Sequence, residues 1–273
     1  RGGEGRRAAG VPTPLGAGPA GPRAAAGAPR APPAAPPSLS PPGSHTFTPS
    51  LYKDLPYDPL KDFKAITMFA SIPNLLVVHP SLPAKSVKEL LALARRHPGE
   101  LHFSSGGHGS NIHLTTELFA YMAGIRLTHV PYKGGGPAQV AVMSGEVQLM
   151  LPAINSALPF VKSERMRALG VSTLTRSPAL PELATIHESG VPGYDKSSWF
   201  ALFAPAAVPE SITSQVYQAA VRVLKNPEIV KLLAAEGAVA VGNSPAEFDA
   251  FVRSELVAWA KLIRQMNLSP GSS

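Results

Sequence analysis

The stretch from Leu101 to Gly124 most constrains what this chain folds into, because it joins a short strand, a glycine-rich loop and a helix. Leu101 and Phe103 alternate with a polar residue, which is typical of a strand end. Apolar residues then recur at helical spacing until Gly124, which is typical of a helix that stops at a glycine. This order predicts an anion site, because the first turn of a helix offers free N–H groups and the positive end of its dipole.

The loop between strand and helix, Ser104–Ser110, offers binding groups rather than reactive ones. Its glycines let a ligand approach the backbone closely, and its serines add hydroxyl donors. No base stands beside a nucleophile, and the spacing matches neither G-x-G-x-x-G nor a loop that ends in Gly-Lys-Ser/Thr. Nucleotide phosphate is therefore disfavoured, while a plain strand-to-helix turn without a ligand stays open as the alternative.

Composition excludes several classes of protein. The chain has no cysteine, so disulfides and thiolate chemistry are excluded, and no apolar run reaches the ~18 residues of a membrane span. The net charge is +7, but residues 1–43 hold five arginines against one glutamate, and no Lys/Arg cluster is interleaved with aromatic residues. We therefore expect no nucleic-acid partner. No apolar core of a signal peptide is visible near the first residue.

Residues 1–43 differ from the rest of the chain. They contain 11 of the 30 prolines, 11 alanines and 9 glycines, and no aromatic residue. Such a segment cannot bury enough apolar surface to offset the entropy lost on ordering, so the composition predicts disorder over residues 1–43.

From residue 44 onward the pattern becomes that of an α/β protein. Strands are predicted over 63–69, 74–79, 127–130, 147–151, 167–172, 199–203 and 239–241, and helices over 87–96, 138–143, 154–161, 211–224, 227–237 and 245–266. Their alternation predicts parallel-rich sheets with helices on both faces. Ligands sit at the carboxyl ends of strands in such sheets, where Ser104–Ser110 and a second glycine loop, Tyr132–Gly136, both fall.

Other candidate groups favour no catalytic chemistry. His113 and Glu117 stand at helical i, i+4 spacing, but His108 lies in the turn, so a hydrogen-bonded pair is favoured over a metal site. Lys133 either meets an anion or is solvated, and Ser198 either lines a cleft or merely precedes a core tryptophan. No Gly-x-Ser-x-Gly elbow and no paired carboxylates are present. We therefore predict no catalytic residue, no metal and no cofactor, and a protein that is not an enzyme.

Six motifs occur together in one order, and they are Tyr52–Pro59, Leu76–Ser81, Ser104–Ser110, His129–Gly134, Arg176–Pro181 and Ser197–Phe200. From about Gly43 to its last residue the chain closely resembles the Bug-type solute-binding proteins of tripartite tricarboxylate transporters. The resemblance implies a periplasmic receptor with the two-domain, type II-like fold of periplasmic binding proteins. The first domain would comprise residues 43–73 and 200–273, the second residues 74–199, with the ligand cleft between them.

The resemblance also implies a function and a set of ligand-binding residues. A monomer would capture a small carboxylate, meaning a di- or tricarboxylate or an amino acid, and deliver it to the membrane subunits of a transporter. The residues that match the family's carboxylate loop are Ser104, Ser105, Gly107, Gly109 and Ser110, and Ser44 and His45 match a loop that faces the cleft. By position we add Tyr132 and Gly134 from the second glycine loop, and Ser198.

Two departures from the family pattern keep rival interpretations open. The family's first strand, loop and helix are not recognisable in residues 1–43, which predicts an incomplete first domain. Leu151–Ala153 stands where the family often has Phe-Asp-Asn, so one polar cleft group is missing. The rivals are an α/β enzyme that uses the Ser104–Ser110 loop to bind a phosphorylated substrate, and a truncated relative without function.

Overall fold

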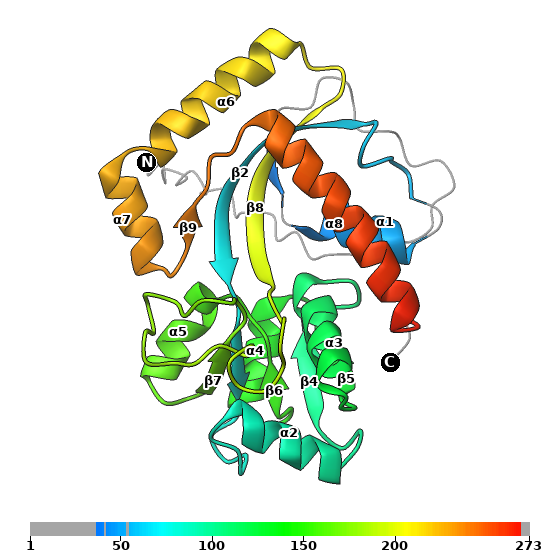
Figure 1. Cartoon of the computed structure of the whole chain (residues 1–273), viewed down its shortest axis with the longest axis vertical. Coiled ribbons are helices and arrows are strands. Elements are labelled where there is room, and N and C mark those ends of the chain that lie inside the picture. The colour runs from blue at the N-terminus through cyan, green and yellow to red at the C-terminus, as the bar shows by residue number, and fades with distance from the viewer. Residues whose placement is uncertain (1–36, 41, 53–54, 269–273) are drawn as a thin grey trace, which may run out of the picture.

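The computed structural model describes residues 37–40, 42–52 and 55–268, which form two β-sheets with helices around them (Figure 1). Residues 1–36, most of the segment with predicted disorder, lie outside the described residues. Ser38–Ser40 does not follow that prediction, because it forms strand β1 and pairs with residues 201–203. The ordered chain therefore includes residues before Gly43, and backbone pairing rather than apolar burial holds them.

The first sheet has the strand order β1-β8-β2-β9, and all of its pairs are antiparallel. Its other strands are β8 (Ser197–Pro205), β2 (Phe63–Pro73) and β9 (Val239–Ala240). The helices on this side of the molecule are η1 (Gly43–Phe47), α1 (Thr48–Leu51), α6 (Glu210–Leu224), α7 (Pro227–Ala235) and α8 (Pro245–Gln265). Strands β2 and β8 form the long central pair and extend toward the second sheet (Figure 1).

The second sheet has the order β5-β4-β6-β3-β7. Its strands are β3 (Leu75–Val78), β4 (His102–Ser105), β5 (Thr128–Pro131), β6 (Leu149–Met150) and β7 (Arg167–Val171). Its helices are α2 (Val87–Arg96), α3 (Asn111–Ala123), α4 (Gly135–Met143) and α5 (Ile154–Lys162). Every helix and strand that the sequence predicts between residues 63 and 266 is present, with small differences at the ends.

The α/β class and the helices on both faces are confirmed, but the strand directions are not those predicted. Between the strands of the described sheets, the parallel pairs are those of β4 with β5 and β6, whereas β3 pairs antiparallel with β6 and β7. The prediction of parallel-rich sheets is wrong here, because β2 passes into β3 through Asn74 alone, with no crossover helix to return the chain. Without such a crossover, β2 and β3 belong to different sheets.

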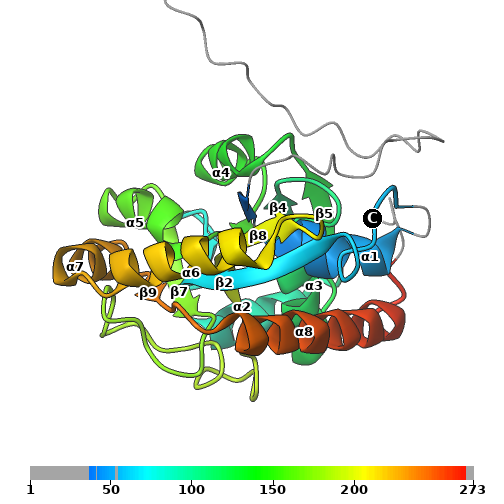
Figure 2. The ribbon, with the colours of Figure 1, turned by 90° about the horizontal axis from the view of Figure 1, so that it is seen from above.

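Strand β3 shows how the second sheet is covered. All of its side chains are 0% exposed, and they alternate between two hydrophobic cores. Leu76 and Val78 pack with residues of α2 and α3, while Leu75 and Val77 pack with residues of α4 and α5. Figure 2 shows α4 and α5 on one side of the strands and α8 on the other. The sequence of a strand that is buried on both faces is a continuous run of apolar residues, as it is in β3.

The core beneath α2 and α3 continues into the first-sheet side of the molecule. Phe47 of η1 packs edge-on against Trp259 of α8, with ring centroids 4.7 Å apart, and both belong to the same core cluster as Leu114 of α3. Helices α3, η1, α1 and α8 therefore form one continuous apolar contact between the two sheets. Among the described residues, no helix is both long and apolar enough to cross a membrane.

Candidate ligand-binding site

The Ser104–Ser110 loop begins at the carboxyl end of β4, as predicted, and the second glycine loop begins beside it at the end of β5. The two strands are parallel, with Ser105 opposite Pro131, and the Tyr132 N–H donates to the Ser105 carbonyl at 3.0 Å. A Cβ on Gly106 would lie 3.3 Å from Gly134 C and Gly135 N, closer than most real Cβ contacts. Glycine at position 106 therefore lets the two loops touch.

Two helices start at this junction, each with free backbone donors. In α3 the Ser110 hydroxyl accepts from the His113 N–H, and the Leu114 N–H donates to the Ser110 carbonyl. The first-turn N–H groups of Asn111 and Ile112 are left without an intrahelical acceptor. In α4, Gly134 at φ 110° precedes the helix, and Pro137 has no N–H. Gly135 and Gly136 thus present two further donors, so two positive helix ends meet at one place.

The first-sheet side closes over this junction through η1 and α1. Gly109 lies at φ 73°, and a Cβ on it would meet Leu51 Cδ1 at 3.0 Å and Tyr52 Cε2 at 3.9 Å. A Cβ on Gly43 would lie 3.9 Å from the Gly109 carbonyl oxygen. The loop therefore lies where the two sides of the molecule meet, which is the place that the sequence predicts for a ligand.

The serine hydroxyls of the loop already have partners. Ser104 is 0% exposed and its Oγ donates to the Ala138 carbonyl of α4 at 2.9 Å. Ser105 is also 0% exposed, and its Oγ accepts from the Gly107 N–H at 3.1 Å and lies 2.6 Å from His129 Nε2. These hydroxyls fix the shape of the loop, and the helix N–H groups are the donors left for a ligand.

Two buried histidines support the loop from below. The Gly109 N–H donates to His113 Nδ1 at 3.1 Å, so neutral His113 carries its proton on Nε2, 3.8 Å from Glu117 Oε1. The rings of His113 and His129 stack with centroids 4.0 Å apart. Burial is the main cause that lowers the pKa of His113 to about 4 and that of His129 to about 3, and it raises the pKa of Glu117 to about 7. Both rings are therefore neutral near pH 7.

His108, His113 and His129 place ring nitrogens within 4.8 Å of one another, which invites comparison with a metal site. The rings of His113 and His129 are only 22° from parallel in their stack, so one ion cannot lie in both ring planes. Nδ1 of His113 is also occupied by a backbone N–H, which keeps the proton on its other nitrogen. The arrangement therefore suits two side chains that position a loop better than it suits a metal ion.

The other predicted site residues lie at varying distances from the junction. His45 is 3% exposed and stacks on Phe203 with ring centroids 3.7 Å apart, inside the first-sheet core. Burial lowers its pKa to about 4. Ser44 belongs to η1, but its side chain lies outside the described part of the chain.

The candidates of the second glycine loop and of β8 have other surroundings. The Tyr132 hydroxyl donates to Glu146 Oε1 at 2.8 Å, and Lys133 is exposed. Trp199 is a core residue that packs on Phe248.

Ser198 lies at the junction together with two asparagines that the sequence interpretation missed. Asn111 Nδ2 donates to Ser198 Oγ at 2.7 Å, and Ser198 Oγ donates to Asn74 Oδ1 at 2.8 Å. No local pattern links residues so far apart in the chain. The one available signal is that each lies next to an element end: Asn74 between β2 and β3, Asn111 at the start of α3 and Ser198 at the start of β8.

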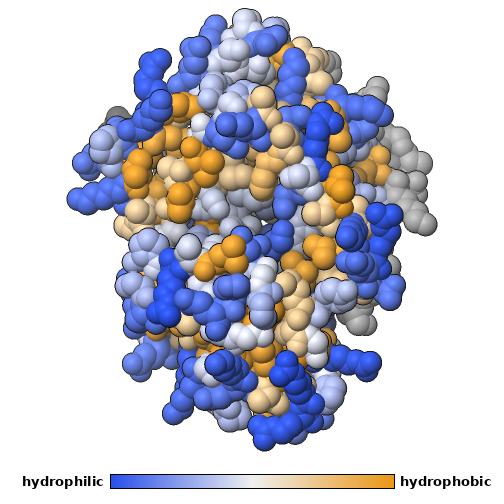
Figure 3. Space-filling model, viewed as in Figure 1, coloured by the Kyte–Doolittle hydropathy of each residue, from blue (hydrophilic) through white to orange (hydrophobic). Residues whose placement is uncertain are grey.

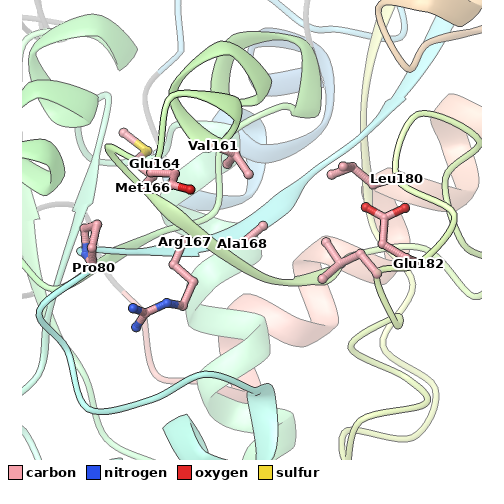
Figure 4. Close-up of a pocket in the computed structure, with 9 residues that line it drawn as sticks. Pro80, Val161, Glu164, Met166, Arg167, Ala168, Leu180 and Glu182 are labelled. Carbon is pink, nitrogen blue, oxygen red and sulfur yellow. The ribbon is translucent and has the colours of Figure 1, made fainter.

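A cavity of about 520 Å³ lies away from this junction, at the outer edge of the second sheet (Figure 4). It is lined by residues of α5 and β7, of the turn between them and of the loop after β7, among them Val161, Glu164, Arg167 and Glu182. The Arg167 guanidinium donates to the Leu82 and Ala84 carbonyls at 3.1 and 3.2 Å, so it braces a neighbouring loop. This cavity belongs to neither glycine loop.

An α/β molecule with two sheets, and with two glycine loops that meet where its two sides join, has the architecture of the periplasmic binding proteins, and solved structures of that class match it. One is the Rhodopseudomonas palustris protein Rpa4515 with adipate, at TM-score 0.81, 35% identity and coverage of 85% of this chain and 78% of that one. Another is the periplasmic binding protein BugD, at TM-score 0.79, 26% identity, 85% and 78% coverage. A third is MatC from Rhodopseudomonas palustris with bound malate, at TM-score 0.76, 27% identity, 83% and 78% coverage.

Residues 39–268 match the model of the tripartite tricarboxylate transporter family receptor, and the chain belongs to this family. A relative from Pseudomonas sp. strain P51, a UPF0065 protein in the tcbD-tcbE intergenic region, is 35% identical over 219 residues, 80% of this chain and 65% of that protein. BugT of Bordetella pertussis is 32% identical over 216 residues, 79% of this chain and 66% of BugT. The chain thus spans slightly less than two thirds of these relatives, and both the family and the fold class expected from the sequence are confirmed.

Proposed function

We propose that the chain is an extracytoplasmic solute receptor that holds a small carboxylate at the junction of the two glycine loops. One observation carries this proposal: the N-termini of α3 and α4 meet there, at the boundary between the two sheets. Four backbone N–H groups, from Asn111, Ile112, Gly135 and Gly136, are available to carboxylate oxygens. Hydrogen bonds to a charged acceptor are roughly twice as strong as neutral ones, so four such donors make an anion site.

The known relatives support this class of ligand. Adipate and malate, which are bound in two of the similar structures, are both dicarboxylates. The contacts described above support separate roles for the glycines and the serines of the two loops. Gly107, Gly109 and Gly134 provide the positive-φ turns, with φ of 117°, 73° and 110°. Ser104, Ser105 and Ser110 hold the loop and the helix start in place, and Ser198 ties the loop to the first sheet.

The remaining parts of the proposal rest on family membership. A receptor of this family works with the membrane subunits of a tripartite transporter and in the periplasm, and we extend both to this chain. We propose that it acts as a monomer, binds no nucleic acid and catalyses no reaction. The junction supports the last point, because the one hydroxyl that pairs with a histidine there, Ser105 Oγ at 2.6 Å from His129 Nε2, is 0% exposed and already accepts from the Gly107 N–H.

Isothermal calorimetry with succinate and with uncharged succinamide tests the proposed function. The two compounds have the same carbon chain and differ in charge, so binding of succinate alone supports recognition of carboxylates. Equal binding of succinate and succinamide overturns the proposal. So does the absence of measurable binding for all three of succinate, adipate and malate. A thermal-shift measurement on the same samples gives an independent readout, because a ligand that binds only the folded state raises its stability.

A further inference from the structure

Basic residues gather around helix α2, at the end of the molecule opposite the first sheet (Figure 1). Residues 85–126 carry five basic and three acidic side chains, whereas residues 210–265, which hold α6, α7 and α8, carry six of each. Figure 3 shows hydrophilic residues over this lower end of the molecule. The five basic residues, which we call the basic end, are all exposed, and they are Lys85, Lys88, Arg95, Arg96 and Arg126.

Three cations of the basic end lie on one side of α2. Arg95 and Arg96 follow Lys88 by seven and eight positions, which is two helical turns, so the three side chains share that side. The other side of the helix is buried through Val87, Leu90, Leu91 and Ala94. Helix α2 therefore packs by its apolar side and presents its charges to solvent.

Two hydrogen bonds join the end of α2 to the end of α3. The Arg95 guanidinium donates to the Ala123 carbonyl at 3.1 Å, and the Gly99 N–H donates to the Arg126 carbonyl at 3.1 Å. Arg126 thus lies beside the last turn of α2, although thirty positions separate it from Arg96. The basic end is therefore one surface, formed by α2 and by the segment that follows α3.

Two partly exposed side chains border this surface. Tyr121 and Met122 belong to the last turn of α3, next to Ala123, and are 50% and 38% exposed. Tyrosine is enriched where lipid headgroups meet acyl chains, because its ring is apolar and its hydroxyl polar. Methionine is a flexible apolar side chain that adapts to irregular surfaces. The basic end thus combines positive charge with side chains suited to a membrane interface.

The three acidic residues of the same stretch have other contacts. Glu89 accepts a backbone N–H at 2.6 Å at the start of α2, and Glu100 lies 3.1 Å from His97 Nδ1. Glu117 lies 3.8 Å from His113 Nε2, below the glycine loop. None of the ion pairs found among the described residues involves a cation of the basic end. The five positive charges are therefore available to an anionic partner.

We propose that the basic end binds the surface of a membrane that contains anionic phospholipids. The cavities of about 520 and 310 Å³ are lined by other residues, so the basic end offers an open surface that suits a layer of headgroups. Each Lys or Arg near such a layer raises the affinity about fivefold. This inference goes beyond the proposed carboxylate binding and does not depend on it.

The geometry of α3 lets both kinds of binding occur at once. The helix has 13 residues, with the proposed carboxylate donors at its first turn and the basic end at its last. A helix of this length places its two ends about 20 Å apart. A membrane on the basic end therefore leaves the junction of the two glycine loops accessible to a solute.

Cosedimentation of the full chain with lipid vesicles tests the proposal. We expect binding to vesicles of equal parts phosphatidylglycerol and phosphatidylcholine, weakening as salt is added, and none to phosphatidylcholine alone. The double variant Lys88→Gln/Arg96→Gln should lower the affinity about 25-fold, because it removes two of the cations. The control Lys231→Gln/Lys261→Gln removes the same charge from α7 and α8 and should change the affinity less than about twofold.

A fluorescent label locates the contact, because the chain has no cysteine of its own. Ala92 lies on the charged side of α2, Ala235 ends α7, and both are exposed. Ala92→Cys and Ala235→Cys, each carrying an environment-sensitive dye, are therefore matched positions. The anionic vesicles should change the emission of the dye at position 92 and leave that at position 235 unchanged.

Four results would overturn the inference. They are no binding to the anionic vesicles, binding that Lys88→Gln/Arg96→Gln does not weaken, equal responses of the two dyes, and binding of soluble polyglutamate without binding of vesicles. The second result would assign the binding to other cations, such as the arginines of residues 1–36, and the fourth would indicate an acidic protein partner. Calorimetry with succinate on the same variants keeps the two proposals apart, because the loss of vesicle binding should leave carboxylate binding unchanged.

Discussion

Helices α3 and α7 show how differently the two sides of this molecule are packed. Eight side chains of α3 are buried, whereas none of the described side chains of α7 is. Both helices have a side-chain cap, from Ser110 in α3 and from Asn226 in α7. The difference is therefore in tertiary burial and not in local helix signals, and tertiary burial supplies most of the stability of a helix.

The weakly packed side extends from α7 to its neighbours α6 and β9. Leu232 and Val239 are 62% and 57% exposed, and apolar side chains gather on this face in the upper left of Figure 3. A cavity of about 310 Å³ opens there, lined by residues of α6, α7 and β9. The junction of the two glycine loops, in contrast, stands on the densely packed second sheet. The helix N–H groups proposed to bind the ligand are thus held by the more deeply buried part of the molecule, as preorganised binding requires.

The largest expected effect contrasts one aromatic residue of α3 with one aliphatic residue of α7. Phe119 is 0% exposed, so Phe119→Ala should lower the free energy of unfolding by about 3–5 kcal/mol, because it removes buried surface and leaves a cavity. Leu232→Ala should change it by less than about 0.5 kcal/mol, because Leu232 is 62% exposed. Urea unfolding of both variants measures the difference, and equal losses would show that α7 is packed as firmly as α3.

Acid should destabilise the protein through its buried histidines. The pKa of His113, His129 and His45 lies at about 4, 3 and 4 in the folded state and at 6.5 for the unperturbed group. Their contribution is complete above pH 6.5 and is lost as the pH falls toward 4, because the unfolded chain then binds more protons. Glu117 acts in the opposite direction, since its pKa is raised from 4.5 to about 7 and its contribution is lost as the pH rises through 7.

The three histidines outweigh this one glutamate, so the free energy of unfolding should fall by about 3 kcal/mol between pH 7 and pH 5. Urea unfolding at several pH values measures the fall, and Glu117→Gln should make it steeper because the opposing group is removed. Stability that is constant or rises toward pH 5 would contradict the burial of these rings.

A smaller effect should come from the hydrogen bond between His113 and the loop. His113→Asn keeps a polar acceptor at the position of Nδ1, while His113→Gln moves the acceptor one bond further along the side chain. The glutamine variant should leave the Gly109 N–H unpaired, which costs about 1–3 kcal/mol, and should weaken carboxylate binding more than the asparagine variant does. Calorimetry and urea unfolding compare the two variants, and equal behaviour of both would mean that Nδ1 does not position the loop.

Much of the fold could be predicted because its signals are local. The capping residues Ser86, Ser110, Asn226 and Ser244 each accept a backbone N–H from the first turn of the helix that follows, and Gly124 ends α3 at φ 61° as a left-handed residue. The strand–loop–helix order predicted over residues 101–124 is likewise the order observed, as β4, the loop and α3. Each of these features depends on residues within a few positions of one another, so the sequence reveals them directly.

The features that could not be predicted depend on register between distant segments. His129 reaches the loop only because β5 pairs in parallel with β4, which sets it opposite Phe103. Asn74 and Ser198 meet because both connections between the sheets pass the same point, although 124 positions separate them. The parallel-rich prediction was wrong for a related reason, since the direction of β3 is set by its partners and not by its own residues. The predicted ligand contacts and domain boundaries stay predictions.

Calorimetry of succinate, adipate and malate binding to Gly136→Asp and Gly136→Asn tests the central claim, that two helix N-termini hold a carboxylate. Gly136 lies in the first turn of α4, and a Cβ there meets no atom within 4 Å, so both side chains fit. Aspartate places its own carboxylate beside the free N–H groups, which should keep the fold stable and lower the affinity at least about 30-fold through repulsion of the ligand. Neutral asparagine, of the same size, should lower it less than about fivefold. Equal affinity in the aspartate variant and the unaltered chain would contradict the account.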